Sequence, residues 1–125
     1  MIRTRVLIAT ASVALVAGCR IGTYVSIGPD DDPPSVSIAA SPATASRGEI
    51  IGLVAAAADD YRVVDVAFYR QDTGGDTLLG RDNSAPYALE TVVPAGASGE
   101  VRYFARATDD AGQVGDSLAV AVTVR

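Results

Sequence analysis

The sequence contains no histidine, no lysine and no tryptophan, and it has a single cysteine among its 125 residues. Without histidine, the chain lacks the commonest zinc ligand and the usual general acid–base group near neutral pH. Without lysine, Schiff-base catalysis is excluded. One cysteine cannot form a disulfide bond within the chain. Any site must therefore be built mainly from carboxylates, hydroxyls and arginines.

Charge of positive sign is also scarce. The sequence has ten arginines and 15 carboxylates, which gives a formal net charge of −5. Nucleic-acid-binding domains normally carry a basic patch, so no nucleic-acid partner is expected. A chain of this length suits one domain rather than two, because each core needs enough chain to bury it.

The longest apolar run lies at the N-terminus. Arg3 and Arg5 precede residues 6–17, which are almost wholly apolar. This run of about a dozen residues is shorter than the ~20 that span a bilayer as a helix. A positive start followed by a short apolar run is typical of a secretion signal. We expect residues 1–18 to be a signal peptide.

The run ends in Val16-Ala17-Gly18-Cys19, which resembles the lipobox of bacterial lipoproteins. The resemblance implies cleavage before Cys19 and attachment of acyl chains, such as palmitate, that hold the protein on a cell-envelope membrane. Arg20 follows where Asp would favour retention at the inner membrane, so the outer membrane of a Gram-negative host is favoured. A secreted protein without lipid and an uncleaved anchor remain the alternatives.

Residues 19–34 form the expected tether. Its second half is rich in proline and aspartate (GPDDDPP, residues 28–34). Proline stiffens such a segment and neighbouring like charges extend it. After removal of residues 1–18, the chain keeps 8 arginines against 15 carboxylates. We therefore expect the lipid at Cys19, not a basic patch, to provide membrane attachment.

Residues 35–125 alternate apolar and polar side chains in short segments separated by turn-forming residues. This pattern predicts an all-β, immunoglobulin-like sandwich of about seven antiparallel strands. The alanine run at residues 55–58 favours a helix by propensity, but its β-branched neighbours and Gly52 favour a strand. The expected strands cover residues 35–39, 51–57, 64–69, 77–80, 87–93, 101–107 and 118–124.

Three segments of this domain resemble the bacterial immunoglobulin-like domain, a fibronectin type III-like sandwich. They are VVDVAFY (63–69), LLGRDNSAPY (78–87) and YFARATDDAG (103–112), in that order. The resemblance implies an extracellular module that serves as a spacer, an adhesion unit or an appendage of a carbohydrate-active enzyme. It carries over no catalytic residue. Such modules often occur in arrays, whereas this one is expected to stand alone because the sequence stops at Arg125.

Several of these residues have structural interpretations. Tyr103 is expected to face the core and to donate a hydrogen bond to backbone, as in the tyrosine corner of related sandwiches. Phe68 is expected to be a principal core residue. Gly80 and Gly112 are expected where a side chain would not fit or where φ is positive.

No motif for nucleophilic catalysis or phosphate binding is present, so no enzyme activity and no obligatory cofactor are expected. Calcium is the one candidate ion, because hard oxygen ligands suit it. The loops with Asp59 and Asp60, and with Asp109 and Asp110, should lie at one end of a sandwich, beside residues 30–32. The alternative is that these aspartates only form turns and face solvent.

One sheet face is a candidate partner site. If Val101 and Tyr103 point inward, Arg102, Phe104 and Arg106 point outward, and Tyr69 shares their face. Aromatic and arginine side chains dominate interface hot spots. The alternative is a surface ring packed against an arginine stem. The outer face should also include Asp65, Ala67, Ala119, Ala121 and Thr123.

Together, these patterns predict a lipid-anchored, non-catalytic binding or structural module in the cell envelope. Its partner would be an envelope protein or a polysaccharide. Two alternatives stay open: a calcium-dependent adhesion or polysaccharide-binding module, and an accessory subunit of an envelope protein complex.

Overall fold

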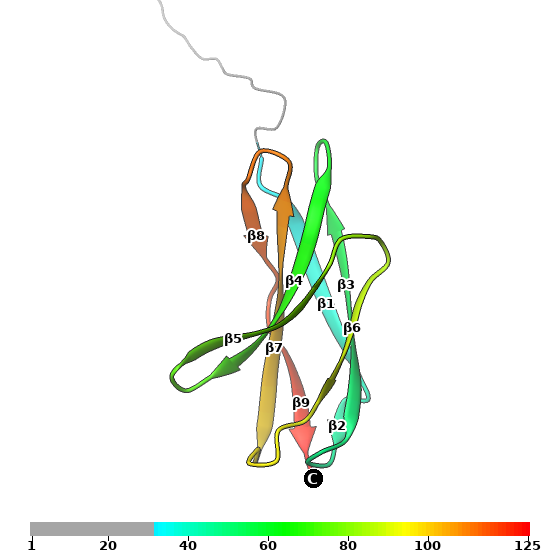
Figure 1. Ribbon diagram of the computed structural model, residues 1–125. Helices are drawn as coiled ribbons and strands as arrows, with labels where there is room; N and C mark the ends of the chain where they lie inside the picture. Colours follow the sequence, from blue (N-terminus) through cyan, green and yellow to red (C-terminus); the bar gives the residue numbers. More distant parts are fainter. Residues whose placement is uncertain (1–31) are drawn as a thin grey trace, which may run out of the picture. The chain divides into compact units, whose positions relative to one another are not determined.

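The computed structural model describes residues 32–125 (Figure 1). The expected signal peptide, Cys19 and most of the tether lie outside these residues. Residues 32–125 form one compact unit. Within this range, no helix is long and apolar enough to cross a membrane.

Strands make up most of the described chain, as the alternating pattern predicts. They are β1 (Ser35–Ser41), β2 (Thr44–Ala45), β3 (Ile50–Ala58), β4 (Val63–Asp72), β5 (Gly75–Asp82), β6 (Tyr87–Val92), β7 (Glu100–Asp109), β8 (Val114–Asp116) and β9 (Val120–Val124). Seven of them correspond to the expected strands. The very short β2 and β8 lie outside the segments that the sequence pattern assigns to strands.

The strands form two sheets (Figure 1). The small sheet has the order β1-β3-β6, with all pairs antiparallel. The large sheet has the order β2-β9-β7-β4-β5, and β8 pairs with β7 beside this path. The β2–β9 pair is parallel, whereas the other pairs of the large sheet are antiparallel. The fold is thus the expected immunoglobulin-like sandwich.

The core lies between the inner faces of the two sheets. Ile51, Leu53 and Ala55 are buried on β3, and Val54 between them is exposed, so the alanine-rich segment is a half-buried strand. From the large sheet, Phe68 and Tyr103 are the largest fully buried side chains. Large apolar rings are therefore few, and small side chains fill much of the remaining space.

The simple alternation is wrong at two places. Val64 was expected to face the core together with Val66, but it is 37% exposed because the register between β4 and β7 shifts between Val63 and Asp65. Leu118 was expected to begin the last strand, but it is 91% exposed and precedes β9. In both cases, an irregularity in strand pairing turns one apolar side chain toward solvent.

Both glycine predictions are confirmed. A Cβ atom on Gly80 would lie 2.9 Å from Leu89 Cδ1, so the second sheet comes too close for a side chain there. Gly112 has φ +84° in the turn between β7 and β8, a conformation that other L-residues rarely adopt.

The prediction for Tyr103 is half right. Its side chain is fully buried, as expected, but among residues 32–125 its hydroxyl has no hydrogen-bond partner. Burial raises the pKa of Tyr103. The predicted bond to backbone is therefore absent from the described part of the chain.

Candidate functional site

The loops that carry the predicted calcium ligands lie at one end of the sandwich, where residue 32 begins the described chain (Figure 1). Asp109 is buried, and its Oδ1 accepts hydrogen bonds from the backbone N–H groups of Ala111 (3.0 Å) and Gln113 (2.8 Å). Asp59 Oδ2 accepts one from Tyr61 N (3.2 Å). These carboxylates therefore shape their own turns, as the alternative interpretation holds.

The four aspartates share an end of the fold but do not form a cluster. Within residues 32–125, no group of three or more acidic side chains is arranged to hold a metal ion. Asp59 Oδ1 is shielded from solvent without a partner in that range. Asp30 and Asp31, which belong to the predicted set, lie outside the described residues. Calcium binding at Asp59, Asp60, Asp109 and Asp110 therefore stays a prediction.

The predicted partner face is built around a stacked aromatic pair. Tyr69 of β4 and Phe104 of β7 are register partners, and their ring centroids lie 5.0 Å apart with an interplanar angle of 9°. The Arg106 guanidinium carbon lies 5.1 Å from the Tyr69 ring centroid and 5.7 Å from that of Phe104. Both aromatic residues and Arg106 thus share the outer face, and the rings pack against the arginine as the alternative interpretation describes.

Phe104 itself is not exposed as the sequence pattern suggested. Only 5% of it is accessible, because the stacked tyrosine and the arginine cover the ring. Arg102 does not join the stack but pairs with Glu100 along its own strand, with Nη2 2.9 Å from Oε1. The accessible part of this face therefore consists of Tyr69, the two arginines and their neighbours.

Two exposed leucines extend the stack in both directions. Leu78 of β5 is the register partner of Tyr69 and is 47% exposed. On the other side, Ser117 N donates to Ala105 O (2.8 Å), which places the backbone of the next residue, Leu118, next to that of Phe104, while the Leu118 side chain is exposed to solvent. We call the row Leu78, Tyr69, Phe104 and Leu118 the apolar band.

The sequence analysis missed both leucines. Leu78 stands next to Leu79, and only the register shift in the β4–β5 pair turns Leu78 outward and leaves Leu79 packed against the core. Leu118 was assigned to the core because it continues the spacing of Val120 and Val122. Local alternation could not reveal either irregularity.

Ion pairs flank the apolar band. Arg106 Nε and Asp116 Oδ1 lie 2.7 Å apart, and this carboxylate raises the pKa of Arg106. Arg81 Nη1 lies 3.4 Å from Asp65 Oδ2. The Arg102–Glu100 pair lies on the same face, and so does Asp76, because Asp76 and Arg102 are the two register partners of Gln71. The face thus holds three arginines and four carboxylates. An apolar strip bordered by charges of both signs has the composition of a docking surface.

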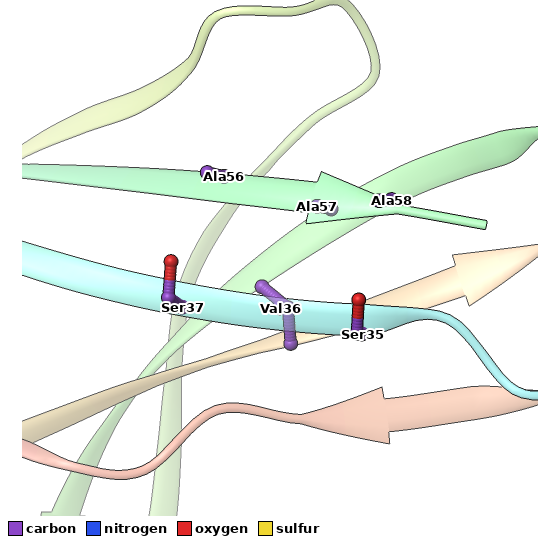
Figure 2. A pocket seen from close by; sticks show the side chains of 6 residues that line it. All are labelled: Ser35, Val36, Ser37, Ala56, Ala57 and Ala58. Atoms are coloured by element: carbon purple, nitrogen blue, oxygen red, sulfur yellow. The ribbon is translucent and has the colours of Figure 1, made fainter.

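Two hollows of the described surface differ in their lining. One lies between β1 and β3 and is lined by small uncharged side chains, as Figure 2 shows. Its polar side-chain atoms are the hydroxyls of Ser35 and Ser37, and no acid or base lines it. A second, more polar hollow lies between the end of β4 and the β6–β7 loop, where Arg70 is held by both oxygens of Asp72.

Comparison with known proteins agrees with the sandwich architecture. The family model for the bacterial Ig domain matches residues 34–105. Among solved structures, the chain is similar to the fibronectin(III)-like modules of Clostridium thermocellum CbhA, with 28% sequence identity and a TM-score of 0.59. The match covers 72% of this chain and 94% of that one. No curated protein matches the sequence.

Proposed function

The chain belongs to the bacterial Ig domain family, and from this membership we propose that it is a lipid-anchored binding module of the cell envelope, attached through Cys19. Domains of this kind are typically structural or binding modules rather than catalysts. The proposal gives the apolar band and its flanking arginines the role of the docking surface.

The observation that carries this proposal is the apolar band. Leu118 is the most exposed large apolar side chain of the described residues, and the Ser117–Ala105 hydrogen bond places its backbone next to that of Phe104. Single exposed leucines are ordinary on protein surfaces, but here two of them lie on either side of an aromatic stack that an arginine covers. Tyrosine and arginine are the residue types that contribute most to binding at interfaces.

Membrane attachment rests on the lipobox and on the charge of the chain. The segment from Val16 to Cys19 supplies the expected acylation site. The acidic chain gives no electrostatic attraction to anionic lipid. We therefore assign attachment to the acyl chains, with residues 20–34 as the spacer between membrane and domain.

Two full-length variants test the two halves of this proposal. Cys19→Ser should move the protein from the membrane fraction to the soluble fraction and abolish incorporation of labelled palmitate. A photo-crosslinking amino acid at position 118 should give discrete adducts in intact cells, whereas the same amino acid at Val54, exposed on the opposite sheet, should not. A membrane-bound Cys19→Ser protein would contradict the anchor, and equal crosslinking from the two positions would contradict the docking surface.

A further inference from the structure

We propose that the apolar band is the interface of a symmetric dimer, in which two copies of this chain face each other across a two-fold axis parallel to the strands. This inference rests on the proposed docking surface and names its occupant. The axis would pass between β4 and β7, the two central strands of the outer face.

The order of residues along the band makes the two-fold arrangement possible. Strand pairing places Leu78, Tyr69 and Phe104 side by side on β5, β4 and β7. Leu118 follows on the far side of Phe104, because Ser117 bonds to both backbone groups of Ala105. The band therefore has a leucine at each end and an aromatic ring at each of its two inner positions.

A two-fold rotation between β4 and β7 exchanges the ends of this row. Leu78 of one copy then faces Leu118 of the second copy, and Tyr69 faces the Phe104–Arg106 edge of the second copy. The two most accessible leucines of the band would thus cover each other, and burial of apolar surface drives association. The interface would be isologous, the commonest arrangement in soluble homo-oligomers.

The same rotation pairs opposite charges. In the neighbouring row, Ala67 of β4 pairs with Arg81 of β5 on one side and with Arg106 of β7 on the other. Arg106 in turn pairs with Asp116 of β8. Arg81 and Asp116 therefore occupy the two ends of that row. In the dimer, Arg81 of each copy faces Asp116 of the other, which supplies two complementary charge contacts.

The charges on this face also differ from those of the chain as a whole. Residues 32–125 contain 7 arginines and 13 carboxylates, so two copies repel each other in most orientations. Around the apolar band, three arginines stand beside four carboxylates, so this face is closer to neutral than the chain as a whole. A second acidic copy therefore meets less repulsion there than the net charge of the chain implies.

The band is short, so we expect a weak dimer. Four neighbouring strand positions at about 4.8 Å spacing extend over roughly 14 Å, which indicates an interface below the usual size of a stable one. Attachment of both copies to one membrane raises their effective concentration and favours the contact.

Cysteine pairing in the full-length, membrane-attached chain tests the geometry. One copy carries L78C and a second, differently tagged copy carries L118C. On mild oxidation of cells that express both, the mixed disulfide should form at least tenfold more than in cells that express L78C alone. In the L78C homodimer, the two cysteines would lie about three strand spacings apart, too far for a disulfide. V54C paired with L118C is the matched control from the opposite sheet.

Charge reversal tests the same geometry without cysteines. R81D alone and D116R alone each place like charges face to face in the dimer, so photo-crosslinking between copies from position 118 should fall at least tenfold. Co-expression of the R81D chain with the D116R chain restores opposite charges between copies and should restore the adduct. In the mixture, each chain still carries its own substitution, so the ion pair that was changed within that chain is not repaired. Restored crosslinking therefore reports only the contact between copies.

The outcomes separate this inference from the proposed function. An adduct of twice the chain mass, with the expected cysteine specificity and charge rescue, supports the dimer. Adducts to a different protein only, or to polysaccharide only, overturn the dimer and leave the docking surface standing. No adduct above the Val54 control overturns both.

Discussion

Phe68 occupies the centre of a core that has few large side chains. It is fully buried on β4, and its neighbours in the core include several alanines. Removal of an aromatic ring from such a place leaves a cavity that the surrounding small side chains cannot refill. Phe68 should therefore contribute more to the free energy of unfolding than any of the small side chains around it.

We expect Phe68→Ala to lower the free energy of unfolding by about 3–5 kcal/mol. Urea denaturation followed by circular dichroism would measure the change, with Val54→Ala as a control at an exposed position of the opposite sheet. A loss below 1 kcal/mol would mean that the core rearranges around the gap.

At Tyr103, by contrast, we expect removal of the side-chain hydroxyl not to destabilise the fold, because this buried group has no hydrogen-bond partner within residues 32–125. A polar group buried without a hydrogen bond costs free energy, so its removal should cost nothing. We expect Tyr103→Phe to keep or raise the free energy of unfolding, by up to about 1–2 kcal/mol. A decrease of similar size in the same denaturation experiment would show that the hydroxyl is hydrogen-bonded in solution.

At the scale of elements, Asp82 joins the two sheets. It ends β5, and its carboxylate accepts hydrogen bonds from Ala88 N of β6 (3.0 Å) and from Ser84 N (3.1 Å). These backbone bonds, with Ala88 as the larger contributor, lower the pKa of Asp82 below its ordinary value of 3.8. The side chain therefore ties the crossover from the large sheet to the small one.

The lowered pKa gives a prediction about acid. The folded state binds the Asp82 proton more weakly than the unfolded state, so the charged carboxylate stabilises the fold above pH 3.8. This contribution is lost as the pH falls from the unfolded value through the lower folded one. Asp82→Asn should thus flatten the decrease of melting temperature as the pH is lowered from 5, and Glu90→Gln, which removes an exposed carboxylate from the other sheet, is measured beside it. Identical slopes for wild type and Asp82→Asn would contradict the role of this bond.

Which elements could be predicted from the sequence depends on how regular they are. In β3, unbroken pairing on both sides preserves the alternation of Ile51, Leu53 and Ala55, and the prediction is confirmed. In β4 and β5, shifts in register turn Val64 and Leu78 outward, and nothing local in the sequence marks those shifts. The Tyr69–Phe104–Arg106 cluster could be predicted because the pairing of β4 with β7 is regular where all three residues lie. The rest of the apolar band could not.

At the scale of the whole molecule, the calcium prediction concerns an entire end of the sandwich. If Asp59, Asp60, Asp109 and Asp110 bind Ca²⁺ together with residues 30–32, the bound ion stabilises the folded state by mass action. The melting temperature of the full chain should then be several degrees higher in millimolar Ca²⁺ than in chelator, and Asp60→Asn should remove the difference. Equal melting temperatures would leave these aspartates with their roles in turns alone.

The two ends of the described chain lie at opposite ends of the sandwich (Figure 1). A pulling force between Asp32 and Arg125 therefore runs along the strands. The last strand, β9, is hydrogen-bonded to β2 on one side and to β7 on the other, and these bonds lie across the direction of pull. They would be loaded in shear, all at once, rather than opened one after another. We therefore expect the module to resist mechanical extension along its length better than its small core implies.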